Sequence, residues 1–313
     1  MMRVACIGEC MIEMREAADG TLSRAYGGDT LNTAVYLARL GVGVDYVTAL
    51  GDDSWSDEMI AGWQAEGIGT EWVMRLAGRL PGLYLVQTDA KGERRFSYWR
   101  DSAAARSLFA LPETPAISEA LLGYDLLYLS GISLSLYGDA GRQLLFDTLD
   151  RARQIGHRVA FDTNFRPRGW PDRSVAQAVY RSAFGRSDIV LASSEDLELI
   201  FGSAGSDELI GHCASAETIL KLPDRTSRIL SRGMDIVVKA EPVDRVVDTT
   251  AAGDSFAAAY LAARLAGADP VAAAAAGHHL AGIVVGHPGA IIPRQAMAGL
   301  IKPQTRSGKE TSP

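Results

Sequence analysis

The chain has 313 residues, of which 47% are apolar and 22% are charged, a composition typical of a folded globular protein. A chain of this length buries enough surface to fold without disulfide bonds or a structural metal. Its formal net charge of −7 argues against a nucleic-acid backbone as partner, because binding to a polyanion requires clustered lysine and arginine. Small anionic ligands stay compatible with this charge, since they respond to the local field of a site.

The cysteines and histidines give no sign of a disulfide framework or a metal centre. The three cysteines, Cys6, Cys10 and Cys213, form no CxxC pair, and none of the five histidines stands at metal-ligand spacing from them. The first residues read as a buried strand and lack the features of a signal peptide. No uncharged apolar stretch reaches the length of about 18 residues that a membrane helix needs. We therefore expect a cytoplasmic protein.

Short apolar runs alternate with segments of helical periodicity, which is typical of βα units and a mainly parallel sheet. In chain order, we predict a strand at 4–7, a helix at 30–40, a strand at 45–49, a helix at 59–66, a strand at 126–130, a helix at 140–155, strands at 158–162 and 189–192, and a helix at 195–201.

Two stretches depart from this alternation. Strand-like runs at 83–88 and 94–99 flank residues 89–92, which have the composition of a hairpin turn. A hairpin within a βα series predicts a small β-lid outside the main sheet, formed by about 80–102 together with 12–26. The second stretch, 219–247, contains short strand-like pieces interrupted by Pro223, Gly233 and Pro242.

No linker divides the chain, so we predict a single α/β domain at 1–302. Its expected architecture is a three-layer α/β/α sandwich with a central, mainly parallel sheet and the small β-lid. The polar segment 303–313 is expected to be a disordered tail.

The strongest local signal for chemistry is the segment 248–254, which reads D-T-T-A-A-G-D and precedes an alanine-rich helix. Small residues at 251–253 let backbone N–H groups approach a ligand, and the start of a helix favours negative charge, so a phosphate could be held there. Asp254 would lie in the first turn, where its carboxylate could accept a proton from an attacking hydroxyl. From spacing alone, an ordinary helix start with a favourable first-turn charge explains the segment equally well.

The segment 248–256 resembles the C-terminal signature of the PfkB (ribokinase-like) carbohydrate kinases, and its two alanines before the glycine resemble the 2-keto-3-deoxygluconate kinase subgroup. A second block, Tyr26–Ala34, reads Y-G-G-D-T-L-N-T-A and resembles the N-terminal sugar-binding motif of the family. Segments 8–13 and 289–294 fit the same subgroup. The resemblance covers roughly residues 3–297 and implies a ribokinase-like fold and an ATP-dependent sugar kinase.

Matching the family signature assigns the catalytic roles residue by residue. Asp254 matches the base that activates the sugar hydroxyl, and the backbone of Ala251, Ala252 and Gly253 matches the anion hole for the transferred phosphoryl group. Asp248 and Thr249 match a segment near a bound monovalent cation such as K⁺, so a cation there is one possibility.

The resemblance also implies a set of sugar contacts, namely Gly28, Asn32, Tyr84, Tyr98, Arg100, Arg166 and Asp254. Two arginines from separate segments could clamp the carboxylate of a sugar acid, because the guanidinium offers a planar pair of donors. Taken without the resemblance, Arg100 and Arg166 could instead be surface charges or members of structural ion pairs. Tyr84 and Tyr98 could equally fill the lid with apolar surface.

For ATP, the resemblance implies contacts from Ser193, Lys221, Ala252, Gly253 and His279. Magnesium is expected to arrive as MgATP, held mostly by phosphates and water. The usual N-x-x-E motif reads S-S-E-D at 193–196, and Lys221 is followed by L-P-D-R where relatives have a glycine-rich turn. Since proline lacks an N–H group, a backbone donor could be lost there. His278 and His279 are interpreted as wall residues of the site, and no Walker A motif is present.

These inferences lead to the hypothesis that the chain phosphorylates 2-dehydro-3-deoxy-D-gluconate at its 6-hydroxyl. A kinase of another sugar, such as fructose, or of a nucleoside, and a non-catalytic sugar or nucleotide sensor stay as alternatives. A small β-layer cannot bury both of its faces alone, so we expect a homodimer formed through the lid. Neither a nucleic acid nor a membrane is expected as partner.

Overall fold

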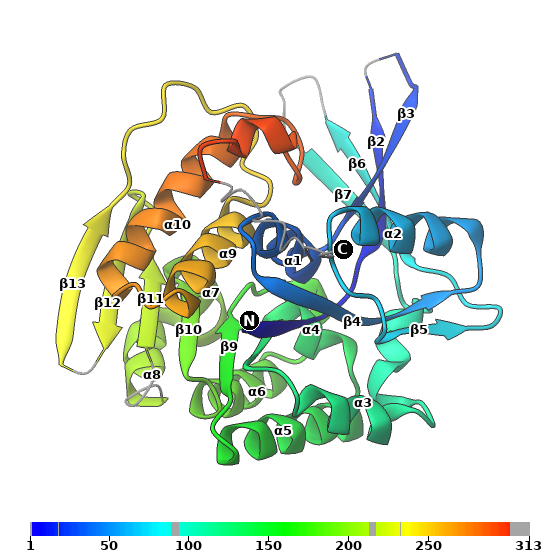
Figure 1. The fold of residues 1–313 in the computed structure, drawn as a ribbon, viewed down its shortest axis with the longest axis horizontal. Helices are drawn as coiled ribbons and strands as arrows, with labels where there is room; N and C mark the ends of the chain where they lie inside the picture. The colour runs from blue at the N-terminus through cyan, green and yellow to red at the C-terminus, as the bar shows by residue number, and fades with distance from the viewer. Residues whose placement is uncertain (1, 18, 89–93, 213–216, 232, 301–313) are drawn as a thin grey trace, which may run out of the picture.

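The computed structural model describes residues 2–17, 19–88, 94–212, 217–231 and 233–300 (Figure 1). The predicted turn at 89–92, the predicted tail at 303–313 and Cys213 lie outside these residues. Within the described ranges, none of the helices combines the length and the apolarity needed to cross a membrane.

A nine-stranded sheet forms the centre of the molecule. Its strands are β1 Arg3–Ile7, β4 Gly43–Gly51, β5 Val73–Leu76, β8 Leu126–Ser130, β9 Arg158–Asp162, β10 Ile189–Ser193, β11 Glu217–Lys221, β12 Thr226–Ser231 and β13 Met234–Lys239. They follow the order β13-β12-β11-β10-β9-β8-β1-β4-β5. Neighbours from β11 to β5 pair in parallel, whereas β12 and β13 add an antiparallel end to the sheet.

Helices cover both faces of this sheet, which explains why its strands read as continuous apolar runs. One face carries α1 Asp29–Arg39, α2 Ser54–Ala65, α9 Ala252–Leu265 and α10 Pro270–Val285. The other carries η1 Ala104–Ala110, α3 Thr114–Leu121, α4 Gly131–Leu136, α5 Asp139–Gln154, α6 Arg173–Gly185, α7 Ser194–Phe201 and α8 Gly205–His212. Along β1, Val4 and Cys6 pack into the first layer and Ala5 and Ile7 into the second, as the alternation of a strand requires.

A second sheet of four strands projects beyond the body of the molecule at the upper right of Figure 1. It consists of β2 Met11–Glu16, β3 Leu22–Gly27, β6 Gly82–Thr88 and β7 Arg94–Trp99, in the order β3-β2-β6-β7. We call this sheet the lid. The predicted fold class, a three-layer α/β/α sandwich with a small β-lid, is therefore confirmed.

Candidate active site

The carboxyl ends of the parallel strands meet along one edge of the large sheet, and polar side chains gather there. Asp162, Ser193 and Lys221 are the last residues of the adjacent strands β9, β10 and β11. A cavity of about 600 Å³ lies between this edge, the start of α9 and the lid. A crevice at the carboxyl edge is where open α/β sheets bind their ligands.

The cavity brings together most of the residues that the sequence pointed to, although they come from distant parts of the chain. Gly28, Asn32, Tyr84, Tyr98, Arg166, Ser193, Lys221, Thr249 and Ala251–Asp254 all line it.

At the turn that starts α9, backbone N–H groups that lack an acceptor in the described structure face the cavity. Ala251 adopts a left-handed conformation with φ of 60°, and within the described ranges no side chain caps the start of the helix. The Ala252 amide donates to the Thr249 carbonyl oxygen at 3.2 Å, whereas the amides of Gly253 and Asp254 have no acceptor among the described residues. Such amides at a helix start can hold an anion.

The Asp254 carboxylate lies beside these amides and is held by a single side chain. Asn32 on α1 donates its Nδ2 hydrogen to Oδ2 of Asp254 at 2.8 Å. Burial raises the pKa of the Asp254 carboxyl to about 8, the nearby Asp29 carboxylate adds to the rise, and the Asn32 hydrogen bond opposes it. A carboxylate with a pKa near the working pH suits proton transfer.

Lys221 places a positive charge next to the same turn. The Nζ atom of Lys221 lies 3.2 Å from Oδ2 of Asp162. A β-carbon added at Gly253 would lie 3.6 Å from this Nζ, so the ammonium group is adjacent to the start of α9. Burial raises the pKa of Asp162, and the lysine opposes that rise.

The inner face of the lid closes the cavity from above. Glu13 on β2 faces Tyr84 on β6 in register and accepts a short hydrogen bond from its hydroxyl. Tyr98 on β7 lies next to Tyr84, with their ring centroids 5.9 Å apart. Aromatic faces and a carboxylate on one surface can contact the apolar and hydroxyl groups of a sugar.

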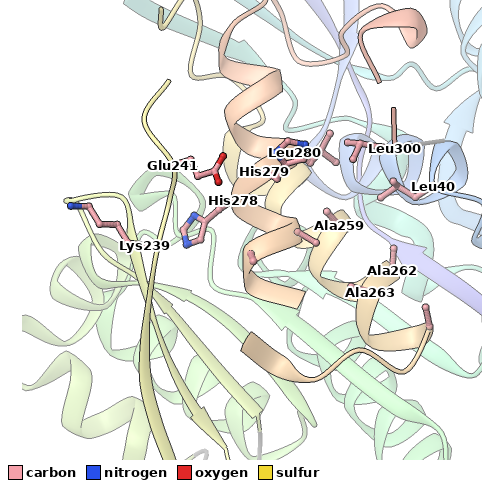
Figure 2. Close-up of a pocket in the computed structure, with 13 residues that line it drawn as sticks. Leu40, Lys239, Glu241, Ala259, Ala262, Ala263, His278, His279, Leu280 and Leu300 are labelled. Atoms are coloured by element: carbon pink, nitrogen blue, oxygen red, sulfur yellow. The ribbon is translucent and has the colours of Figure 1, made fainter. Parts of the chain in front are cut away.

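Two predicted residues do not reach this cavity. Arg100 follows β7 and forms a short ion pair with Glu9, whose side chain is 1% exposed. His279 is an exposed residue of α10 and is not among the residues that line this cavity. It lines a separate cavity of about 610 Å³ beside α10, together with Leu40 and Leu300 (Figure 2).

His278, the preceding residue of α10, also lines this cavity of about 610 Å³. It lines a smaller cavity of about 240 Å³ as well. This smaller cavity shares Thr249 and Ala252 with the 600 Å³ cavity under the lid. The Nε2 atom of His278 lies 2.9 Å from Ser227 Oγ, and burial lowers the pKa of the imidazole. The smaller cavity and the one under the lid together form an extended site with the start of α9 between them.

Asp248 is buried under the turn and is surrounded by donors. Its Oδ1 accepts from the Thr250 amide at 2.9 Å and from the Thr250 hydroxyl at 2.6 Å. Its Oδ2 accepts from the Gly289 amide at 3.1 Å and lies 3.7 Å from Arg15 Nη1.

Sequence reasoning missed several polar residues of the cavity, among them Glu13, Arg15, Asp29, Asp162 and Asn164. Two signals could have found some of them. Asp162 ends a predicted strand at the edge where ligands bind, and Met11, Glu13 and Arg15 alternate along one face of a strand. Asn164, which donates to Asp29 at 2.7 Å, has no such signal.

This arrangement suits phosphoryl transfer. It combines an anion-binding turn, an ammonium group and a carboxylate that can take a proton from a hydroxyl, all beside a cavity covered by a lid.

Comparison with known proteins agrees with a phosphoryl-transfer site. The model of the pfkB family carbohydrate kinases matches residues 1–297. The 2-dehydro-3-deoxygluconokinase of Dickeya dadantii is 43% identical over 94% of this chain and 98% of its own length. That of Haemophilus influenzae is 37% identical over 96% and 98%.

Solved structures agree in fold. The 2-dehydro-3-deoxygluconokinase of Thermotoga maritima superposes with a TM-score of 0.81 at 22% identity, covering 96% of this chain and 98% of that one. A putative ribokinase II of E. coli in complex with ATP and Mg²⁺ gives 0.81 at 20% identity, covering 96% and 99%. The fold is therefore ribokinase-like, and the chain belongs to the pfkB family of carbohydrate kinases.

Proposed function

We propose that this kinase transfers the γ-phosphoryl group of ATP to the 6-hydroxyl of 2-dehydro-3-deoxy-D-gluconate. The observation that carries the proposal is the half-buried Asp254 carboxylate beside two backbone amides for which the described part of the chain offers no acceptor. Its specificity for a sugar acid is supported by near-full-length relatives, 37–43% identical, that are named 2-dehydro-3-deoxygluconokinase.

In this proposal Asp254 is the general base, and residues 251–253 form the anion hole. Asp254 takes the proton of the sugar hydroxyl as the hydroxyl oxygen attacks the γ-phosphorus, and the bond from that phosphorus to the bridging oxygen breaks to release ADP. The amides of the turn hold the negative charge of the migrating phosphoryl group. Lys221 adds a positive charge beside Gly253.

The sugar end of the cavity is assigned to Gly28, Asn32, Tyr84, Tyr98 and Arg166. Asn32 Oδ1 is buried and has no hydrogen-bond partner among the residues that the structure describes, so a sugar hydroxyl could donate to it. Arg166 is exposed to the cavity and can meet the carboxylate. Arg100 would have to leave Glu9 to contact the sugar, so we assign it first to holding the end of β7 in place.

The nucleotide is assigned to the smaller of the cavities lined by His278 and to the start of α9. Ser193, Lys221, Ala252 and Gly253 would face its phosphates. Magnesium, when bound with ATP, would neutralise phosphate charge with Glu195 and Asp196 of the same cavity nearby. A monovalent cation such as K⁺ would lie near Asp248 and Thr249, where Arg15 and backbone amides already offset the carboxylate.

We also propose that residues 1–302 work as one kinase domain in the cytoplasm. Cys6 and Cys10 are free, buried thiols, as a reducing compartment allows.

An ADP-release assay over a panel of sugars and sugar acids tests the proposed function. We expect the highest kcat/KM with 2-dehydro-3-deoxy-D-gluconate, and loss of activity when Mg²⁺ is chelated. The same assay with and without K⁺ tests the cation. A higher kcat/KM with fructose, ribose or a nucleoside would contradict the substrate assignment, and inactivity with every sugar would favour a sensor.

Asp254→Asn should lower kcat by about a thousandfold, the scale of losing a general base. For the wild type, kcat/KM should rise with pH and level off above about 8, because the carboxyl must lose its proton to act and its pKa is raised to that value. The variant should lack this dependence. Calorimetry of sugar and ATP binding serves as the control, and near-normal turnover would refute the role of Asp254.

Arg166→Ala should raise KM for the sugar acid by about ten- to a hundredfold, the scale of a charge-assisted hydrogen bond. The analogue whose carboxylate is reduced to an alcohol should lose much less, since it never used that charge. Steady-state kinetics on both substrates make the comparison within one variant. An equal loss for both would remove Arg166 from carboxylate recognition.

We propose further that the lid joins two copies of the chain. Exposed apolar side chains gather on it, with Trp99 60% and Leu22 58% exposed. Trp99→Glu should convert a dimer into a monomer, measured by light scattering. Leu199→Glu, on an equally open position of α7, is the matched control and should leave the mass unchanged. A monomeric wild type would contradict the proposal.

A further inference from the structure

Arg15 is a cavity residue for which the catalytic proposal gives no role. It lies on β2, one of the two central strands of the lid, and shares the inner face with Met11 and Glu13 because alternate residues of a strand point the same way. Its side chain lines the cavity and is 34% exposed to solvent.

Arg15 is held on the lid by the carboxylate that also binds the sugar-facing tyrosine. Its Nη2 atom donates to Oε1 of Glu13 at 3.0 Å. The other oxygen of Glu13 accepts from the Tyr84 hydroxyl. If a sugar displaces Tyr84, the Glu13 carboxylate would therefore move with it, and the guanidinium of Arg15 would move with Glu13.

On its other side, Arg15 reaches the body of the protein at the root of the anion-binding turn. Nη1 lies 3.7 Å from Oδ2 of Asp248, which also accepts from the Gly289 amide. Asp248 holds Thr250 through two hydrogen bonds, and Thr250 directly precedes Ala251. The lid and the turn are thus joined through one guanidinium.

The contact between Arg15 and Asp248 suits a reversible connection. At 3.7 Å it is an ion pair without a direct hydrogen bond, and the guanidinium is partly open to solvent, so salt weakens it. A small inward movement of the lid would bring the two groups into hydrogen-bonding range. An outward movement would break the pair.

We infer that Arg15 is a positioning residue that couples occupancy of the sugar site to the order of the anion-binding turn. The inference rests on the proposed function. When the lid closes over the sugar, Arg15 engages Asp248 and fixes the turn that faces the nucleotide phosphates. Sugar and nucleotide therefore strengthen each other's binding, and by linkage the two effects are equal.

The test measures this coupling directly. Calorimetry gives the Kd of a non-hydrolysable ATP analogue with Mg²⁺, without sugar and with saturating 2-dehydro-3-deoxy-D-gluconate. For the wild type we expect the sugar to tighten analogue binding by about fivefold or more. Arg15→Gln should reduce this factor to below about twofold while leaving the Kd without sugar unchanged. Arg15→Lys, which keeps the charge, should restore part of the coupling.

Arg24→Gln is the matched control. Arg24 also lies on the lid, is 33% exposed and pairs with Glu58 of the body, but it does not line the cavity. This variant should retain the wild-type coupling. A structural weakening of the lid would affect both variants alike, whereas the proposed coupling separates them.

The outcomes distinguish this inference from the proposed function. A wild type that phosphorylates the sugar acid but shows no coupling, or an Arg15→Gln variant that keeps the full factor, would overturn the role of Arg15 alone. A wild type that binds no sugar acid would overturn the proposed function first. If Arg15→Gln unfolds, Glu13→Gln serves instead, because it removes the negative charge that pairs with Arg15 and keeps an acceptor for Tyr84. It too should lower the coupling factor, and an unchanged factor would count against the role of Arg15.

Discussion

Asp29, Asp162 and Asp254 lie on three different elements and face one cavity, so the fold must offset three negative charges that are close together. Each carboxylate has its own partner: Asn164 donates to Asp29, Lys221 pairs with Asp162, and Asn32 donates to Asp254. Only one of these partners carries a charge. Asp254 has only the neutral Asn32 as partner, and burial raises its pKa to about 8, which suits a group that must accept a proton.

The parallel sheet brings these groups together without a dedicated loop. Strands β9, β10 and β11 end side by side, so residues that are about thirty positions apart in the chain become neighbours. Two helices that cover one face of the sheet, α1 and α9, supply Asn32 and Asp254, which are 222 residues apart in the chain. The lid adds polar and aromatic groups on one side of the cavity, and the large sheet forms the opposite side.

The sequence was most informative where one local rule dominates. Strands at 126–130 and 158–162 agree with prediction at both ends, because uninterrupted apolar runs between polar residues describe strands that are buried on both faces. The start of α9 was also evident from its small residues. By contrast, 12–26 was assigned to the lid without individual strands, and the structure has two there, β2 and β3.

Contacts between distant segments could not be predicted in the same way. The pairing of Arg100 with Glu9 depends on where the end of β7 meets the end of β1, which no local pattern encodes. The choice between His278 and His279 depends on the rotation of α10 about its axis. A shift of one residue on a helix turns a side chain by about 100°, and of the two histidines only His278 lines the 240 Å³ cavity, although both line the 610 Å³ one.

Ala251 stands in a backbone region that glycine adopts freely and that costs alanine about 1 kcal/mol. Its methyl group also limits the conformations of the unfolded chain, as any side chain does relative to glycine. The same methyl group leaves the folded turn few alternative shapes. After each product leaves, the amides at the start of α9 should return to one orientation, so successive catalytic cycles begin from the same geometry.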